Sequence, residues 1–373
     1  MSKICVYAIC KNELKFVEQW LENMSEADYI VVLDTGSTDG TYEKLKEDSR
    51  VTLVKQQEIK PWRFDVARNE SMKLIPDDAD ILVCTDFDEL FEPGWAQYLR
   101  DNWVPGYHNR CHYSYAWAHD EGGRSEFVFQ YDKIHTRDLH WIFPVHEVLW
   151  AIDENQYKEV CLEAKEHIFL HHWQDISKSR ESYLELLKLS CAENPNSSHV
   201  WSLLAREYLN NGDYDNSLAV CLETLKKPDI DTASMGLILL NTLLFTAKNY
   251  FFLKNYDEAL WYCQEFIRAD STYREPYFLM ASIFNETRVY TMAEAALLAG
   301  VKNGIEKKNW VELQKTWTTD EYTILGAIYL NMGKYEEAAQ QLKYALNYDA
   351  NNLSVLQQYT LALENWLKKV VEK

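Results

Sequence analysis

The sequence contains little glycine and little proline, with 12 and 8 of these residues in a chain of 373. Collagen-like, elastic and proline-rich disordered chains need far more of both, so these classes are excluded and extensive helix is expected. Hydrophobic residues make up 47% of the chain. This is enough to bury the cores of two or three domains of ordinary size.

Positive charge is also scarce. The chain has 38 Lys and Arg residues against 58 Asp and Glu residues, which gives a formal net charge of -20. A chain this acidic is unsuited to the phosphate backbone of a nucleic acid or to an anionic membrane surface. We therefore expect no nucleic-acid partner, whereas a metal ion that holds an anion locally is compatible with this charge.

Long apolar runs and paired cysteines are absent. No segment reaches the ~18 apolar residues of a membrane span, and the longest candidate, which begins at Met235, is interrupted by Asn241. The apolar start of the chain runs into Lys-Asn-Glu without a cleavage site, so we expect a strand there and not a signal peptide. None of the eight cysteines forms a CxxC pair, which favours buried, reduced thiols and a cytoplasmic location.

Short apolar runs alternate with helical patterns in the first half of the chain. We expect strands over residues 4–9, 29–33, 51–54 and 81–85, and helices over residues 14–24, 41–48 and 66–75. This alternation predicts an α/β domain with a mostly parallel sheet and helices on both faces. Ligands of such sheets collect at the carboxyl ends of the strands, where the motifs DTGSTDGT and DFDE both lie.

A repeat follows from about residue 177, where long helical patterns replace the strands. Four tyrosines are each followed, three positions later, by a small residue; the pairs are Tyr214 and Ser217, Tyr256 and Ala259, Tyr290 and Ala293, and Tyr335 and Ala338. The 34-residue spacing between the second and third tyrosines is that of tetratricopeptide repeats, and the wider spacings imply insertions. We predict an α/β domain over residues 1–176 and an all-α repeat domain over residues 177–373, with an irregular helical bundle as the alternative.

The DFDE motif offers two carboxylates for a metal ion. Asp86 and Asp88 stand two positions apart at an expected strand end, so both can point to one side. Two carboxylates leave coordination positions of Mg²⁺ or Mn²⁺ free for water and substrate phosphates. An acidic loop that caps the next helix is the alternative for this motif alone.

The DTGSTDGT motif is suited to a nucleotide. Asp34 ends an expected strand, and the glycines after it permit a tight turn. Asp34 can accept hydrogen bonds from a ribose or a base there, and a capped turn without a ligand is the alternative. Further along, Arg68 can bring positive charge to a diphosphate, or form a surface ion pair with Asp65.

Four segments together resemble the family 2 glycosyltransferases, which have the GT-A nucleotide-sugar-binding fold. The segments are CVYAICKNEL, VVLDTGSTDGT, FDVARNES and ILVCTDFDELF, and their order and spacing fit as well. With its VHE segment, double histidine and repeats, the chain is similar to a bacterial subgroup. That subgroup includes the S-glycosyltransferases of glycopeptide bacteriocins (glycocins) of the sublancin type. The resemblance covers about residues 1–220, with looser support to residue 345.

This resemblance implies an inverting transfer of a hexose from a UDP-sugar, with Mn²⁺ or Mg²⁺ as the cofactor. The implied acceptor is a Cys, Ser or Thr side chain of a peptide or protein. Asp34 would contact the uridine, Asp39 would lie at the ribose side, and Arg68 would face the diphosphate. The implied lining of the uridine pocket is the backbone of Ala8, Ile9 and Cys10, and the implied holders of ribose, metal and phosphates are Asp86 and Asp88.

An inverting displacement also needs a base on the face opposite the diphosphate. The family's usual Glu-Asp pair has no clean copy in this sequence, so we predict that Glu147 is the base, with His146 as the alternative. The segment IFLHHWQD supplies His171 and His172, and one of them fits a further metal ligand. Structural roles for these residues are the alternatives: a satisfied His-Glu pair and a packing cluster at a helix start.

Two other functions stay open at this point. One is a glycosyltransferase for a cell-surface glycan or a lipid-linked acceptor, which no membrane segment supports. The other is a non-catalytic repeat adaptor with a relic GT-A domain, against which the intact motifs argue. The expected partners are a UDP-sugar donor and a peptide or protein acceptor, and a homodimer through the repeat domain is one candidate assembly.

Overall fold

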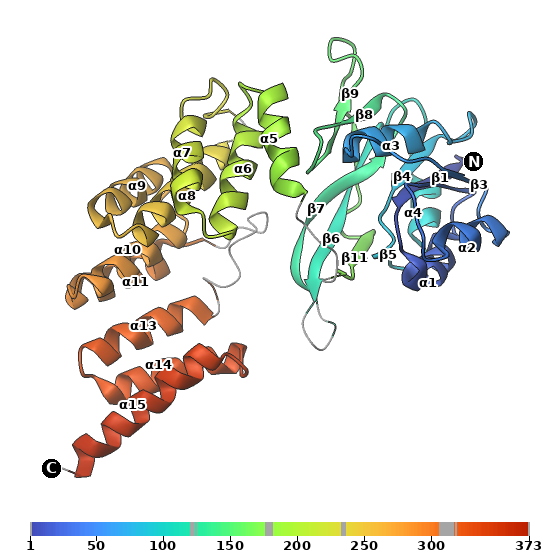
Figure 1. Ribbon diagram of the computed structural model, residues 1–373. Helices are drawn as coiled ribbons and strands as arrows, with labels where there is room; N and C mark the ends of the chain where they lie inside the picture. Colours follow the sequence, from blue (N-terminus) through green and yellow to red (C-terminus); the bar gives the residue numbers. More distant parts are fainter. Residues whose placement is uncertain are drawn as a thin grey trace. The chain divides into compact units, whose positions relative to one another are not determined.

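The computed structural model describes residues 2–119, 123, 125–175, 182–232, 236–305, 317 and 319–371. The chain divides into two compact units, Met1–Ser190 and Cys191–Lys373 (Figure 1). The predicted domain boundary after residue 176 lies outside the described residues. Over the described ranges, no helix combines the length and apolar character that crossing a membrane requires.

The first unit is an α/β domain built on a mixed sheet with the strand order β3-β2-β1-β4-β7-β6-β11-β5. Its strands are β1 (Ile4–Cys10), β2 (Tyr29–Asp34), β3 (Leu53–Gln56), β4 (Ile81–Cys84), β5 (Glu89–Phe91), β6 (Arg110–His119), β7 (Ser125–His135), β10 (Cys161–Glu163) and β11 (Phe169–His172). Neighbouring strands among β1 to β4 are parallel, as predicted, whereas β7 is antiparallel to β4 and to β6. The fold class is confirmed, and the β6–β7 hairpin makes the sheet mixed.

Both faces of β1 are covered. Its even-numbered residues share a core cluster with α1 (Leu14–Met24), α2 (Thr41–Glu47) and α4 (Trp95–Asn102). Its odd-numbered residues pack with α3 (Phe64–Met72) and with a two-stranded sheet of β8 (Leu139–Ile142) and β9 (Val148–Ala151), which lie opposite α1 and α2 in Figure 1. Because successive strand residues face opposite sides, a strand covered on both faces reads as a continuous apolar run.

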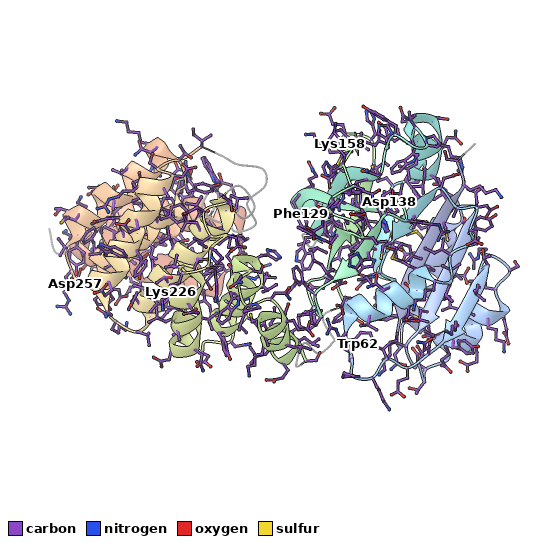
Figure 2. The ribbon with its side chains drawn as sticks, turned by 90° about the horizontal axis from the view of Figure 1, so that it is seen from above. Trp62, Phe129, Asp138, Lys158, Lys226 and Asp257 are labelled. Carbon is purple, nitrogen blue, oxygen red and sulfur yellow. The ribbon has the colours of Figure 1, made fainter. Side chains whose placement is uncertain are left out.

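The β6–β7 hairpin carries an aromatic layer. The Tyr115 ring lies 5.2 Å from that of Phe129 and 4.8 Å from that of Tyr131, between ring centroids (Phe129 is labelled in Figure 2). Tyr115 itself is buried, and its hydroxyl donates a hydrogen bond to Glu89 at 2.9 Å. Through this hydrogen bond, the aromatic layer holds Glu89, which belongs to the buried charge network described below.

The second unit consists of helices that contact one another in successive pairs. The pairs are α6 (Ser198–Asn210) with α7 (Tyr214–Thr224), α8 (Leu237–Phe252) with α9 (Tyr256–Ala269), α10 (Glu275–Glu286) with α11 (Tyr290–Asn303), and α13 (Thr319–Asn331) with α14 (Tyr335–Tyr348). A helix before them, α5 (Tyr183–Glu193), contains the boundary between the units, and α15 (Leu353–Val371) follows the last pair. Each repeated tyrosine is the first residue of the second helix of its pair, so the predicted helical repeats are confirmed.

The small residues of the repeat lie where helices touch. All four are fully buried: Ser217, Ala259, Ala293 and Ala338. The Ser217 hydroxyl also donates a hydrogen bond to the carbonyl of Ala205 on the partner helix at 2.8 Å. A larger side chain at these positions would collide with the neighbouring helix, which explains why small residues recur.

Candidate active site

The carboxyl ends of β1 and β2 meet at Asp34, which is fully buried and pairs in register with Cys10. Its Oδ1 accepts hydrogen bonds from the backbone N–H groups of Gly36 at 3.0 Å and Ser37 at 2.9 Å, and from the Gln56 side chain at 3.0 Å. Gly36 has a φ of 114°, a conformation that suits glycine. Burial opposes ionisation, but the hydrogen bonds from Ser37, Gln56 and Gly36 outweigh it and lower the pKa of Asp34.

Asp39 connects two turns at the same edge. Its Oδ2 accepts a hydrogen bond from the Leu14 N–H at 3.1 Å, and its Oδ1 accepts two from Thr41, at 3.0 Å from the N–H and 2.6 Å from the hydroxyl. Burial opposes ionisation here as well, but the Thr41 and Leu14 hydrogen bonds outweigh it and lower the pKa of Asp39. The structure thus shows Asp39 bracing the turn after β2, and its place at a ribose stays a prediction.

The end of β1 projects beyond one neighbouring strand. β1 pairs with β2 through Cys10 but with β4 only through Tyr7. The Cys10 carbonyl accepts hydrogen bonds from the backbone and side chain of Thr35, at 2.8 and 3.0 Å. The backbone of Ala8 and Ile9 therefore lies along the edge that Asp34 closes, and contact with a uridine stays a prediction.

Arg68, on α3, is the centre of a buried charge network. Its Nε lies 2.5 Å from Oε1 of Glu147, its Nη2 3.0 Å from Oδ1 of Asp86, and its Nη1 3.2 Å from Sγ of Cys84. The guanidinium also lies over the ring of Trp141, 5.3 Å from the centroid. Although burial opposes its charge, Asp86, Cys84 and Glu147 outweigh that effect and raise the pKa of Arg68.

This placement excludes the surface ion pair of Arg68 with Asp65, whereas contact of Arg68 with a diphosphate stays a prediction. Asp65, the alternative surface partner, instead pairs with Arg63 at 2.8 Å. Only 5% of the Arg68 side chain is exposed, so the residue is a buried cation directed at the end of β4. A buried guanidinium in such a place has to be paired, which the two carboxylates accomplish.

Lys133, on β7, belongs to the same network and was missed by the sequence analysis. Its Nζ lies 3.1 Å from Oε1 of Glu89 and 3.3 Å from Oδ2 of Asp86, and the side chain is 6% exposed. Burial opposes its charge, but Asp86 and Glu89 outweigh it and raise the pKa of Lys133. One signal was available: Lys133 stands at alternate positions with Tyr131 and His135, and hence on the same face of a strand.

The pKa values of Asp86 and Glu89 shift in opposite directions in this network. Arg68 and Lys133 outweigh the burial of Asp86 and hold its pKa well below the usual range, so this carboxylate stays charged. Burial, together with the charge of Asp86, raises the pKa of Glu89 although Lys133 opposes this. Glu89 also accepts the Asp86 N–H at 2.9 Å, and it thereby fixes the turn that presents Asp86 and Asp88.

Asp88 lies beside His172, from a segment far away in the sequence. Oδ2 of Asp88 and Nε2 of His172 are 3.6 Å apart, and both side chains are largely buried. The Nδ1–H of His172 donates to the Trp117 carbonyl at 3.2 Å, which leaves Nε2 facing Asp88. Burial lowers the pKa of His172, but the hydrogen bond and charge of Asp88 outweigh it and raise that pKa.

His171 lies on the opposite face of β11. Its Nε2 is 3.4 Å from Glu92, and its Nδ1 is 2.9 Å from Nε2 of His119. Adjacent strand residues point to opposite faces, so only one residue of the double histidine can reach Asp88. The structure brings His172 to it.

His146 and Glu147 lie in the segment between β8 and β9. His146 has a φ of 51°, and its ring meets the edge of Tyr183 at 5.8 Å between centroids. The segment is held to the start of α3 by a hydrogen bond from the Phe64 N–H to the Pro144 carbonyl at 2.9 Å. Glu147 is thereby directed to Arg68, and a role for either residue as a base stays a prediction.

The donor set at Asp88 fits a hard divalent cation. A carboxylate and an imidazole whose ligand atoms are 3.6 Å apart can both contact one ion. Asp86 is held by Arg68 at 3.0 Å and by Lys133 at 3.3 Å, and its role as a metal ligand stays a prediction. A cation held by Asp88 and His172 would keep positions free for water and phosphates, as Mg²⁺ sites commonly do.

Comparison with known proteins agrees with this division. Residues 5–137 match the family model for glycosyl transferase family 2, and residues 322–352 match a tetratricopeptide-repeat model. The match to the family 2 model thus lies within the first unit, and the match to the tetratricopeptide-repeat model lies within the second. The first match spans β1 to β7 and contains Asp34, Arg68, Asp86, Asp88 and Lys133.

A search of curated proteins gave no match. Among solved structures, the chain is similar to a tetratricopeptide-repeat protein of Thermus thermophilus, with 20% identity, a TM-score of 0.39, and coverage of 49% of this chain and 90% of that chain. It is also similar to a tetratricopeptide-repeat protein of Parabacteroides merdae, with 14% identity, a TM-score of 0.38, and coverage of 51% and 68%. The MamA protein has 20% identity, a TM-score of 0.34, and coverage of 45% and 81%.

Proposed function

We propose that this protein is an inverting glycosyltransferase that transfers a hexose from a UDP-sugar to a Cys, Ser or Thr side chain of a peptide or protein. The observation that carries the proposal is the meeting of Asp88 and His172 beside the Asp86–Arg68–Lys133 network. Asp86 and Asp88 lie just beyond the carboxyl end of β4, in a segment that matches the family 2 model.

The nucleotide end of the donor is assigned to the edge formed by β1 and β2. Asp34 stays ionised there because hydrogen bonds hold its charge, so it can accept further hydrogen bonds from uridine. The backbone of Ala8, Ile9 and Cys10 lies along the same edge. The ribose is assigned to Asp39 and Asp86.

The diphosphate is assigned to the two charge clusters at Arg68 and at Asp88. Arg68 and Lys133 supply two buried positive charges, and Asp88 with His172 supplies ligands for Mn²⁺ or Mg²⁺. Such an ion, when bound, stabilises the negative charge of the departing UDP. Because Arg68 and Lys133 are fixed by buried partners, their charges are oriented before the donor binds.

The acceptor proton is assigned to Glu147, with His146 as the alternative. A base that accepts this proton must lie on the side of the sugar opposite the departing diphosphate. Glu147 is a carboxylate next to the network yet is not placed with the metal ligands. The repeat unit is proposed to hold the acceptor peptide, since its match is to a repeat family and repeats offer extended binding surfaces. Pairing of two copies through this unit stays a prediction.

The test is a donor and acceptor survey with the purified full-length protein. UDP release from UDP-glucose, UDP-galactose and UDP-N-acetylhexosamines is measured with Mn²⁺, with Mg²⁺ and with a chelator. Synthetic peptides that present Cys, Ser or neither are then compared by mass spectrometry. We expect metal-dependent UDP release and a mass increase of one hexose on a Cys or Ser peptide. A folded protein that binds no UDP-sugar and releases no UDP would favour the non-catalytic adaptor instead.

A further inference from the structure

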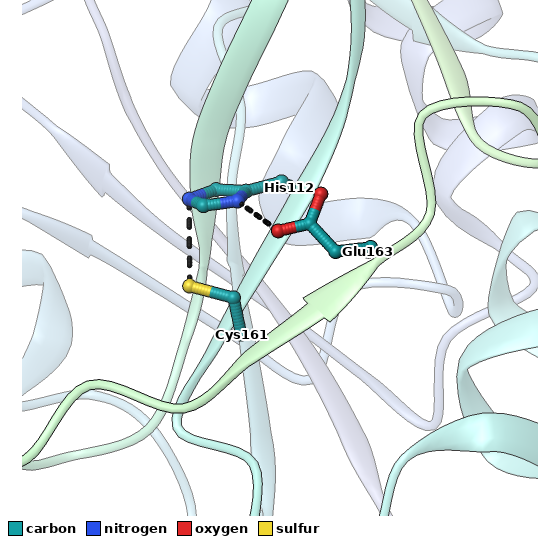
Figure 3. Close-up of side chains that lie close together, drawn as sticks. All are labelled: His112, Cys161 and Glu163. Carbon is teal, nitrogen blue, oxygen red and sulfur yellow. Dashed lines mark hydrogen bonds and ion pairs between the residues drawn. The ribbon is translucent and has the colours of Figure 1, made fainter.

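Three side chains with metal-binding chemistry lie together on strands of the first unit that the proposed reaction does not use. His112 lies on β6, and Cys161 and Glu163 lie on β10, which pairs with β6 in parallel (Figure 3). His112 and Glu163 are opposite each other in the strand register. Leu162, between Cys161 and Glu163, and its register partner Cys111, next to His112, pack with the core, so the three side chains share the other face.

The contacts fix the direction of the imidazole. Its Nδ1 lies 2.7 Å from Oε1 of Glu163, and its Nε2 lies 3.4 Å from Sγ of Cys161. A carboxylate only accepts hydrogen bonds, so Nδ1 carries the proton and the Nε2 lone pair faces the sulfur. Metal-bound histidines are commonly held in this way by a carboxylate.

The spacing suits a tetrahedral zinc ion. Bonds of about 2.1 Å to nitrogen and about 2.3 Å to sulfur put the two ligand atoms about 3.5 Å apart. The observed separation is 3.4 Å, and one ligand atom from each of the three residues lies within 4.8 Å of the others. In the described part of the chain, this is the one group of three or more such side chains that meets this distance.

We propose that His112, Cys161 and Glu163 form a Zn²⁺ site. Nε2 and Sγ are direct ligands at their present spacing, Glu163 holds the imidazole and balances the charge, and water completes the coordination. A thiolate with an imidazole selects zinc over Mg²⁺ or Mn²⁺, so this site and the oxygen-rich site at Asp88 differ in the metal they take.

The same three groups could be read as a nucleophile, a base and an orienting acid, but the surrounding charges favour a cation. Glu163 is the carboxylate beside the imidazole, at 2.7 Å, whereas Glu159 is paired with Arg110 at 3.1 Å. The negative charge of Glu163 attracts a divalent ion to Nε2 and Sγ. The role of the ion would be to fasten β10, a strand of three residues, to β6.

Cobalt substitution tests the proposal, because a Co²⁺–thiolate bond gives a charge-transfer absorption that oxygen ligands do not. The full-length protein is freed of metal and titrated with Co²⁺ and then with Zn²⁺. We expect one equivalent of Co²⁺ to produce the band and Zn²⁺ to abolish it. Cys161→Ser should remove the band, and because the other seven cysteines are buried, no other thiol should replace it. Asp88→Asn, at the oxygen-rich site, should leave it unchanged.

A second variant keeps the proposal testable if Cys161→Ser folds poorly. The Glu163 side chain is 56% exposed, so Glu163→Gln should fold normally. Loss of a carboxylate that holds a metal-bound histidine lowers metal affinity 10–100-fold, and we expect a loss of that size for Zn²⁺. Absence of the thiolate band in the wild-type protein, its persistence in Cys161→Ser, or an unchanged zinc affinity in Glu163→Gln would each overturn the site.

Discussion

Nε of Arg68 and Oε1 of Glu147 lie 2.5 Å apart, in an ion pair whose side chains are 5% and 11% exposed. The pair joins α3 to the segment between β8 and β9, and through Arg68 it connects Glu147 to Asp86. One carboxylate oxygen of Glu147 is therefore engaged in this contact. Because Arg68 is assigned to the diphosphate, this contact argues for a donor-side role of Glu147, and a role as base requires its other carboxylate oxygen to face the acceptor.

Replacing Glu147 tests the assigned base. We expect Glu147→Gln to lower kcat for a hydroxyl acceptor by about 10²–10⁴-fold, the usual contribution of a general base. A Cys acceptor should lose less, because a thiol with a pKa of ~8.5 supplies some thiolate unaided. The KM for the UDP-sugar should not change, and steady-state kinetics with both acceptors measures this.

The matched control is His146→Asn, which removes the neighbouring alternative. If the Glu147 variant weakens UDP-sugar binding and spares the chemical step, Glu147 is a donor-site residue that acts through Arg68. His146 would then be the next base to examine.

Removing the ligand pair should abolish metal activation. Asp88→Asn keeps the size of the side chain but weakens the ligand that faces His172, so we expect UDP release to become insensitive to Mn²⁺ and to fall by about 100-fold or more. Glu92→Gln, on an exposed carboxylate that contacts His171, is the control and should keep full activation. Normal turnover of Asp88→Asn with added Mn²⁺ would contradict the metal assignment.

The charge of Lys133 should be essential for stability. Lys133→Met leaves Asp86 and Glu89 without one buried cation, and breaking a buried pair in this way costs about 3–5 kcal/mol. Lys158→Met, on an exposed lysine, should change stability by less than about 0.5 kcal/mol. Urea unfolding of both variants measures the difference, and a loss below about 1 kcal/mol for Lys133→Met would show that the network tolerates the missing charge.

A buried neutral histidine should make stability depend on pH. His135 receives the Tyr7 hydroxyl on Nε2 at 2.6 Å and lies with Nδ1 2.6 Å from the Thr136 carbonyl, while the Trp141 N–H donates to Tyr7 at 2.8 Å. Burial lowers the pKa of His135 to about 3, although the hydrogen bond to Thr136 opposes this. In the unfolded chain the pKa of His135 is ~6.5. Between pH ~3 and pH ~6.5, His135 is therefore protonated in the unfolded chain but neutral in the folded protein.

The stabilisation is therefore complete above pH ~6.5 and is lost as the pH falls from there towards ~3. His135 alone should contribute a loss of about 1.5 kcal/mol between pH ~6.5 and pH ~5. Urea unfolding at several pH values gives the free energy of unfolding as a function of pH. This free energy should change less steeply with pH for His135→Gln than for the wild-type protein. Equal slopes would mean that His135 does not remain neutral in the fold.

The turns of the repeat offer a stability test with a built-in comparison. Two residues before each repeated tyrosine, the backbone has positive φ, with Gly212 and Gly333 in two turns and Lys254 and Arg288 in the others. This conformation costs a non-glycine residue about 1–2 kcal/mol. Replacement by glycine removes that cost, but part of the gain is lost because glycine makes the unfolded chain more flexible. Arg288→Gly should thus stabilise the protein by about 0.5–1 kcal/mol, and Gly333→Ala should destabilise it by a similar amount. Thermal unfolding with the two variants shifted in the same direction would refute this account.

The sequence by itself determined the local elements and the residues at strand ends. Continuous apolar runs marked β1, β2 and β4 because both of their faces are buried, and recurring tyrosines and small residues marked the helix pairs. Asp34, Asp86 and Asp88 were predicted to share one edge because parallel strands place their carboxyl ends together.

Only the tertiary structure decided which distant residues meet. Strand alternation could say that His171 and His172 face opposite ways, but the pairing of β11 with β5 selected His172 for Asp88. Lys133 joined Asp86 because the hairpin returns antiparallel to β4, a strand far from it in the sequence. Such contacts depend on strand register and burial, which are set by the packing of the whole sheet and not by neighbouring residues.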